Sequence, residues 1–514
     1  MPIDLTQLPE DPQMLQRMVR DLSAQLDRES AERHKIESLL REFLQGKRGR
    51  KSEQLSDEQL ALFAAAWEAH EAATAQAESA ENSDDDSQKT DAGANASAPR
   101  KRGGGRQPLA RDLKRERIVH DLEEAEKHCT VCQQDLRAIG EDTSEHYEYI
   151  PAQVIVVEDV CKKYACECTI KTATKPSQPI EKSTAGASLL AQVIVAKTVD
   201  HLPLHRQEQI FERQGIDISR KTMGGWMAQS ADLMGPLYTA AKRVLFESKV
   251  IGTDDTGVQV LDEKRTRIGR IWPYRGDAAH PVILYDYTRT RERAGPEAFL
   301  KGYTGHLQAD AYGGYDALFK EPGRGLSEVG CWSHARRYFI KAVESDTEHM
   351  GPALFLIAQL YQVETKARPL TPDQRLKMRQ QKAQPTLDKL HDYLVEIQPV
   401  VLPKSPAGRA VSYTLNNWEA LNRYCTDGDL EIDNNATERA IRGITVGRNN
   451  WLFFGSDAGG KTAAVLRSFT ASCQRVGVEP FTWFKDVLSR IADHPISRVA
   501  ELLPHNWASA KVTT

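Results

Sequence analysis

Hydrophobic and polar positions alternate with different periods along the chain, and the first period is helical. Residues 12–46 carry apolar side chains at alternating spacings of three and four, a heptad seam that predicts a coiled coil. Glu29 and Arg33 interrupt the seam and could set its register by pairing across it. A single amphipathic helix packed on its own chain is the alternative, because so short a seam is marginal.

Residues 64–117 are predicted to be a linker. Residues 68–98 are mostly Ala, Ser, Glu and Asp and cannot form a core, which predicts a flexible acidic segment. The basic stretch PRKRGGGRQPLARDLKRER, residues 99–117, suits contact with phosphates. A solvated tether is the alternative reading of this stretch.

Cysteines gather in the next segment, residues 118–172, which holds five of the eight cysteines of the chain. A CxxC pair and a CxC pair can together close a tetrahedral zinc site. The predicted ligands are Cys129, Cys132, Cys166 and Cys168. Cys161 and His128 are possible substitutes, and free thiols in a small α+β unit are the alternative.

Residues 185–248 return to a helical pattern. A first helix, a turn at Gly215, an N-cap-like Ser219 and a second helix with Trp226 resemble a helix-turn-helix. Because helical hairpins also occur without DNA contact, both interpretations stay open.

The spacing of hydrophobic residues then changes from the helical period to the period of strands. Segments rich in Val, Ile and Tyr over residues 249–344 predict a sheet with two strand-to-helix units. Residues 345–430 are helical, residues 431–475 contain a further helix and strand, and residues 476–514 form a tail. This order predicts a multidomain α+β protein whose sheet domain is interrupted by a helical insertion.

Composition narrows the function classes. A chain of 514 residues needs several cores. Its net charge of -4 confines any DNA contact to local patches. The N-terminus lacks a secretory pattern and the longest apolar run, Leu60 to Trp67, is too short for a membrane span, so we expect no membrane partner.

Three acidic residues suit phosphoryl transfer. Asp254 ends the first predicted strand, Asp310 ends a later one, and Glu438 lies on the helix after the insertion. Converging carboxylates can hold two divalent ions that neutralise a phosphate and activate water, and Mg²⁺ needs few such ligands. Each carboxylate taken singly is more simply a turn or cap residue.

Four strings read together resemble one known family. TDDTGVQVL, LQADAYGGYDAL, CWSHARRYF and DNNATERAIRGITVGRNNWLFFGS closely resemble transposases of the insertion sequence 66 family. The order of zipper, basic linker, zinc unit, helical domain and catalytic domain is also similar, over about residues 12–508. The resemblance implies a DDE transposase with an RNase H-like α/β catalytic core that cleaves and transfers DNA strands with two Mg²⁺ or Mn²⁺ ions.

The same resemblance implies roles for individual residues. Asp254, Asp310 and Glu438 are expected to be catalytic and to bind metal, with Asp255 an alternative first ligand because Asp254-Asp255-Thr256-Gly257 replaces the usual Asp-Glu-Thr-Pro. Asn449 stands where the family usually has Lys. The expected DNA contacts are His334, Arg336, Arg337, Arg439, Arg442, Arg448 and Lys461.

Some of these side chains have a simpler interpretation. His334 either orients DNA or a carboxylate, or is an ordinary histidine at a helix start. Trp332 and Trp451 either stack on a displaced base or belong to the core.

The resemblance also implies partners. These are the terminal inverted repeats and target DNA, a second protomer bound through the coiled coil, and accessory transposition proteins. It further implies a structural zinc ion and a bacterial, cytoplasmic location at the nucleoid.

Two rival functions remain. One is a DNA-binding protein that has lost its chemistry. The other is an ATPase, because GSDAGGKT, residues 455–462, fits the P-loop pattern. Too few residues follow it for the further strands of a P-loop domain, so we interpret this segment as a turn that leads into a helix with Lys461 near DNA.

Overall fold

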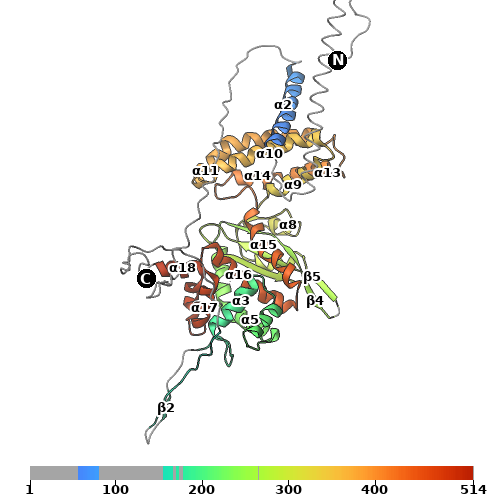
Figure 1. Cartoon of the computed structure of the whole chain (residues 1–514). Coiled ribbons are helices and arrows are strands. Elements are labelled where there is room, and N and C mark those ends of the chain that lie inside the picture. Colours follow the sequence, from blue (N-terminus) through green and yellow to red (C-terminus); the bar gives the residue numbers. More distant parts are fainter. Residues whose placement is uncertain (1–55, 80–153, 166–169, 173–176, 264, 513–514) are drawn as a thin grey trace, which may run out of the picture. The chain divides into compact units, whose positions relative to one another are not determined.

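A computed structural model describes residues 56–79, 154–165, 170–172, 177–263 and 265–512 (Figure 1). The chain forms two compact units, one of residues 83–175 and one of residues 1–82 with 176–514. In the smaller unit, β1 (Lys163–Ala165) pairs antiparallel with β2 (Ile170–Thr172). The predicted coiled coil and the four predicted zinc ligands lie outside the described residues.

The larger unit is built on a mixed sheet of seven strands. The strands are β3 (Val250–Thr253), β4 (Thr256–Asp262), β5 (Arg265–Arg275), β6 (Ile283–Thr288), β7 (Gly305–Gln308), β8 (Leu326–Val329) and β9 (Phe453–Phe454). Their β-branched and aromatic side chains alternate between buried and open faces in β4, and are buried on both faces in much of β6.

The long strand β5 organises the sheet. One of its edges pairs antiparallel with β6, and the other pairs antiparallel with both β4 and β3. Thr256 faces Ile271 and Thr253 faces Tyr274, so β3 and β4 follow one register that is interrupted only at Asp254 and Asp255. On their far side β7 pairs parallel with β3, β8 pairs parallel with β7, and β9 pairs parallel with β4.

Helices from both ends of this unit share one core with the sheet. From the N-terminal side come α3 (Ala187–Thr198), α4 (Leu204–Arg213), α5 (Arg220–Leu233) and α6 (Gly235–Phe246). From the C-terminal side come α15 (Asn435–Trp451), α16 (Asp457–Arg475), α17 (Pro480–Arg490) and α18 (Pro504–Val512). Trp483 and Phe484 are fully buried in the cluster that also contains Leu190 of α3, so the described part of the predicted tail, residues 476–512, packs on the core.

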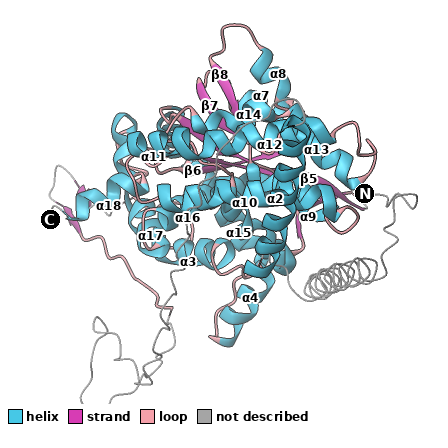
Figure 2. Ribbon diagram, turned by 90° about the horizontal axis from the view of Figure 1, so that it is seen from above, coloured by secondary structure: helices cyan, strands magenta, loops and turns pink. Residues whose placement is uncertain are grey.

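The contact between α16 and β6 closes the edge of the sheet. The backbone N–H groups of Ile283 and Tyr285 donate to the hydroxyl oxygens of Ser472 and Ser468, at 3.0 and 2.8 Å. These hydroxyls satisfy the outward N–H groups of an edge strand, which would otherwise be buried without partners. Figure 2 shows α16 and α15 lying over β5 and β6.

The predicted helix-turn-helix segment has the expected local structure. Helix α4 ends before Gly215, whose φ of 78° favours glycine. Ser219 caps α5 by accepting a hydrogen bond from the backbone N–H of Thr222, at 3.1 Å. Trp226 is buried in the core, so its ring supports packing of the segment.

A second core lies in the helical insertion. It contains α9 (Trp332–Ala342), α10 (Thr347–Ala367), α11 (Pro372–Met378), α12 (Gln384–Ile397), α13 (Pro406–Asn416) and α14 (Trp418–Asn422). Arg379, which has no exposed side-chain surface, forms an ion pair with Glu364 at 2.7 Å inside this core. None of the described helices is both long and apolar enough to span a membrane.

The linker prediction is wrong for its first part. Residues 64–79 belong to α2 (Asp57–Ser79), which packs on α10 (Figure 1). Phe63 and Trp67, four residues apart and thus on one helix face, are both buried against the insertion. The surrounding alanines favour a helix, so two large side chains are sufficient to dock it.

Replacing Trp67 with alanine should therefore lower the free energy of unfolding by about 3 kcal/mol, because it leaves a cavity in the second core. Chemical denaturation would measure this change. The neighbouring exposed residue offers the matched control, Glu68→Ala, which should change stability by less than about 0.5 kcal/mol. Equal effects of the two substitutions would contradict the packing of α2.

Candidate active site

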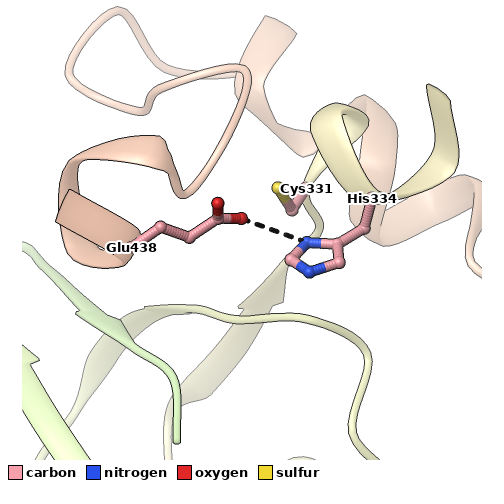
Figure 3. Close-up of side chains that lie close together, drawn as sticks. All are labelled: Cys331, His334 and Glu438. Carbon is pink, nitrogen blue, oxygen red and sulfur yellow. Dashed lines mark ion pairs between the residues drawn. The ribbon is translucent and has the colours of Figure 1, made fainter. Parts of the chain in front are cut away.

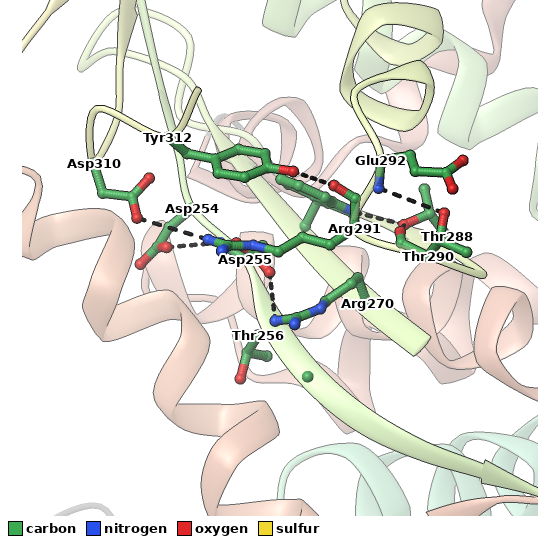
Figure 4. A network of polar contacts seen from close by, with 12 residues as sticks. Asp254, Asp255, Thr256, Arg270, Thr288, Thr290, Arg291, Glu292, Asp310 and Tyr312 are labelled. Carbon is green, nitrogen blue, oxygen red and sulfur yellow. Dashed lines mark hydrogen bonds and ion pairs between the residues drawn. The ribbon is translucent and has the colours of Figure 1, made fainter. Parts of the chain in front are cut away.

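Two aspartates meet where β3 and β7 end side by side. Because these strands are parallel, their carboxyl ends lie at the same edge of the sheet. Asp254 follows β3 directly, in the interruption between β3 and β4, and Asp310 follows β7 by two residues. Figure 4 shows the two carboxylates facing the same space.

Burial and mutual repulsion perturb both aspartates. Burial raises the pKa of Asp254 to about 7; the backbone N–H of Asp255 opposes this shift, and the charges of Asp310, Asp255 and Glu438 add to it. Burial also raises the pKa of Asp310 to about 6, again with contributions from Asp255 and Glu438. The three predicted carboxylates therefore share one electrostatic environment, which favours a bound cation.

Asp255 is placed differently from its neighbour. Its side chain is only 2% exposed, and both of its oxygens are held by arginines. Arg270 contacts Oδ2 at 2.8 Å, and Arg291 contacts Oδ1 at 2.7 Å. In Figure 4 the Arg291 guanidinium extends on toward Asp310 Oδ2, 3.9 Å away. The centre of the Tyr312 ring lies 4.1 Å from Cζ of the same guanidinium.

The sequence alone did not identify Arg270 and Arg291 as site residues. Neither lies in a string that resembles the family, and an arginine on a strand or loop is ordinary. Only the pairing of β4 with β5 brings Arg270 opposite Gly257 and thus close to Asp255.

The start of α15 is locked onto the end of β3, and this contact positions Glu438. Asn434 is buried, and its side-chain Nδ2 donates to the carbonyl of Thr253 at 2.7 Å. Thr437 packs so closely on Gly252 that a Cβ at residue 252 would lie 2.3 Å from its hydroxyl oxygen. The string DNNATE therefore carries two residues that dock the helix and one, Glu438, whose charge helps to raise the pKa of both aspartates.

Glu438 is held by the helix that begins at the CWSHARR string. Arg337 of α9 binds it with two nitrogens, Nη2 to Oε2 at 2.8 Å and Nη1 to Oε1 at 3.2 Å. His334 Nδ1 lies 3.7 Å from Oε1 (Figure 3). Such a bidentate pair fixes the carboxylate strongly.

Cys331 completes a small cluster with these residues. The potential metal-ligand atoms of Cys331, His334 and Glu438 lie within 4.8 Å of one another. Within the described part of the chain, this is the group of Cys, His and acidic residues close enough together to hold a metal ion. The thiol is buried and accepts a hydrogen bond from the backbone N–H of Asn434 at 3.2 Å, and burial raises its pKa to about 12. The oxygens of Asp254, Asp310 and Glu438 are not gathered this tightly among the described residues.

The remaining predicted DNA contacts divide into exposed and structural residues. Arg439 and Arg442 on α15 and Lys461 on α16 are exposed. Arg448 is half-buried and donates to Gly257 O at 2.7 Å, so it ties α15 to β4. Arg336 is half-buried beside the ring of Tyr361.

The two tryptophans also differ. Trp332 is fully buried and donates to Leu421 O at 2.9 Å, which confirms the core alternative for it. Trp451 is half-buried and stacks on Phe454, with ring centres 4.5 Å apart.

The P-loop interpretation is wrong. Helix α16 begins at Asp457, only two residues after β9, and leaves no loop long enough to surround a phosphate. The Gly459 N–H donates to the Ser456 hydroxyl and the Gly460 N–H donates to the Ser456 carbonyl, both at 3.1 Å. The glycines thus belong to a capped helix, as the alternative interpretation of this segment predicted.

Comparisons with known proteins agree with this arrangement. A model of the IS66 transposase family matches residues 182–462, and one of the IS66 C-terminal element matches residues 468–505. A zinc-finger binding domain of IS66 transposases matches residues 126–169, which include the four predicted zinc ligands. A model named Transposase C of IS166 homeodomain matches residues 35–118. The chain belongs to the IS66 transposase family.

Relatives of full length are also similar. "Uncharacterized protein y4hP" of Sinorhizobium fredii is 32% identical over 507 residues, with 93% of this chain and 89% of the relative covered. "Uncharacterized protein y4jD" of the same organism is 31% identical over 410 residues, with 76% and 80% covered.

The raised pKa values predict how pH acts on stability. Asp254 and Asp310 bind protons more tightly in the folded chain than an aspartate with the ordinary pKa of 3.8 does. Their favourable contribution is therefore complete below about pH 4 and is lost as the pH rises through 6 to 7. Asp254→Asn should raise the free energy of unfolding by on the order of 2 kcal/mol near neutral pH and much less in acid.

Urea denaturation at the two pH values would measure this difference, with the exposed Asp392→Asn as the matched control. Added Mn²⁺ should stabilise the natural chain near neutral pH and should have little effect on Asp254→Asn. An Asn variant that is less stable than the natural chain at neutral pH would contradict the electrostatic description.

Proposed function

We propose that this transposase is a DDE enzyme in which Asp254, Asp310 and Glu438 hold two Mg²⁺ or Mn²⁺ ions and cut and rejoin DNA. The observation that carries the proposal is the convergence of two strand ends and the α15 start on one acidic, partly buried site. Hard carboxylate oxygens fit these ions. The ions would supply charge neutralisation at the phosphate and activation of the attacking water or 3′-hydroxyl.

The sheet supports an RNase H-like core. Three antiparallel strands, β6, β5 and the joined β3–β4, are followed across the sheet by β7 and β8 parallel to β3. Along the chain, Asp254 lies at the interruption of the first of these strands and Asp310 follows the fourth, with Glu438 on a helix beyond the insertion. This order and placement support the RNase H-like core that the family resemblance implies.

The surrounding residues suit distinct parts of the reaction. Arg270 and Arg291 bind both oxygens of Asp255, which supports Asp254 as the first metal ligand and Asp255 as the anchor of two cations. Arg337 neutralises Glu438, and a DNA phosphate that drew Arg337 away would release the carboxylate. Arg439 and Arg442 are exposed on the helix of Glu438, where they can contact the DNA backbone.

The parts of the chain outside the catalytic site have proposed roles in assembly. Cys129, Cys132, Cys166 and Cys168 would hold a structural zinc ion, the coiled coil would join protomers, and α4 and α5 with the basic stretch would recognise the terminal repeats. Target DNA and accessory proteins would bind to the assembled complex.

A cleavage and joining assay on labelled element ends with Mg²⁺ tests the chemistry. Asp254→Asn and Glu438→Gln should each lower the rate by on the order of a thousandfold, because each removes a metal ligand from the transition state. Asp392→Asn should leave the rate unchanged. Full activity of both active-site variants would identify a DNA-binding protein that uses none of these groups.

The substitution Asp255→Asn tests whether Asp255 anchors the two arginines or binds the metal. It should lower the free energy of unfolding by on the order of 2 kcal/mol, since it leaves Arg270 and Arg291 beside a buried neutral group. Stabilisation by Mn²⁺ should persist in this variant and should be absent from Asp254→Asn. The reverse pattern, in thermal unfolding with and without Mn²⁺, would make Asp255 the ligand.

A further inference from the structure

A large pocket lies away from the carboxylates, between the helix-turn-helix segment and the start of α16. Its volume is about 710 Å³, within the range of small-molecule sites. Trp451, Phe453 and Phe454 line one part, while Leu204 of α4 and Met227 of α5 line another. The pocket therefore offers flat aromatic and apolar surfaces of the kind that bind a planar ring.

A buried arginine and a half-buried lysine border this pocket. Arg467 is only 8% exposed, and its Nη1 donates to the carbonyl of Thr198 at 2.9 Å. Its buried Nε has no hydrogen-bond partner among the described residues. Lys197 lies with its Nζ 5.4 Å from the ring centre of Trp451, and burial lowers its pKa to about 8.

The pocket has no compensating negative charge of its own. Neither Asp nor Glu lines it, although Arg220 and Lys221 at the start of α5 also reach it. Within the described part of the chain, no carboxylate oxygen lies within 4.0 Å of the Arg467 or Lys197 nitrogens. A guanidinium stays charged at any physiological pH, and burying it without a negative charge beside it is costly. This arrangement calls for an anionic ligand.

The anionic ligand must also fit the aromatic side chains that line the pocket. A nucleotide has both parts, a phosphate for the cations and a base for Trp451 and Phe453. A free nucleoside triphosphate fits poorly, because the N–H groups of Gly459 and Gly460 are already used within α16 and cannot cradle a phosphate chain. A strand of DNA needs no such cradle for each of its single phosphates.

We propose that this pocket takes one unpaired nucleotide of the bound DNA, with its phosphate on Arg467 and Lys197 and its base against Trp451 and Phe453. The inference rests on the proposed function. Helix α15 connects the two sites, because Glu438 lies in its first turn and Trp451 at its end, about 20 Å away at 1.5 Å per residue. A strand leaving the catalytic site can thus be held at a fixed distance from it.

Binding of two short duplexes tests the pocket, measured by fluorescence anisotropy without added Mg²⁺ or Mn²⁺. One duplex is fully paired and the other carries a single unpaired 2-aminopurine nucleotide. The natural full-length chain should bind the second about tenfold more tightly, the effect of stacking one base on an aromatic ring. Lys197→Gln and Trp451→Ala should each remove most of this preference.

Two further variants guard against a trivial loss of structure. Ala458→Trp, at an exposed position of the lining, should fill the pocket and abolish the preference while every cation remains. Lys485→Gln, an exposed lysine on α17 outside the pocket, should keep the full tenfold preference. Equal binding of both duplexes by the natural chain, or a preference retained in Ala458→Trp, would overturn the proposal.

Two further measurements complete the test, namely binding of free nucleotides and cleavage of DNA. If ATP or dAMP alone bound in a Lys197-dependent manner and displaced the unpaired duplex, the ligand would be a free nucleotide and the assignment to DNA would be wrong. Cleavage with Mg²⁺ on element ends distinguishes the two proposals. Intact cleavage without the preference would refute the pocket alone, and the preference without cleavage would refute the chemistry alone.

Discussion

The docking of α15 onto the end of β3 is the contact on which the candidate active site depends. Asp254 and Glu438 are far apart along the chain, and the whole helical insertion lies between them. Asn434 closes this distance by binding the last carbonyl of β3, and Thr437 fits against a glycine that leaves room for it. The insertion can therefore be large without moving the glutamate, because the chain that follows it is fixed to the end of β3.

Charge compensation explains how so many acidic groups coexist at this site. Asp255 is neutralised by Arg270 and Arg291, and Glu438 is neutralised by Arg337. Asp254 and Asp310 lack equally close cations and bear the largest pKa shifts of the group. The site is thus stable as a folded structure, yet retains two carboxylates whose charge is best balanced by something that binds.

The helices around the sheet connect the helix-turn-helix segment with the candidate active site. Helices α3 to α6 share their core with α16 and α17, so the helix-turn-helix segment is not an independent module of the larger unit. The pocket lined by Lys197 and Arg467 lies at this junction, where both parts contribute walls. A strand that bound there would contact the helical segment together with α15, the helix that carries Glu438.

Local chemistry in the sequence determined much of this protein. Alternating β-branched residues, the turn at Gly215 and the cap at Ser219 identified the strands and the helical hairpin, because these signals depend only on near neighbours. The strings around Asp254, Asp310 and Glu438 identified the family. The tertiary structure decided what depends on distant partners. Residues 64–79 resembled a linker because Phe63 and Trp67 are the only buried side chains among those described in α2, and their burial requires the insertion. The pairing of Asp255 with two arginines, of Glu438 with Arg337, and the structural use of Arg448 likewise depend on which strands and helices lie side by side, and residue spacing along one chain does not specify that.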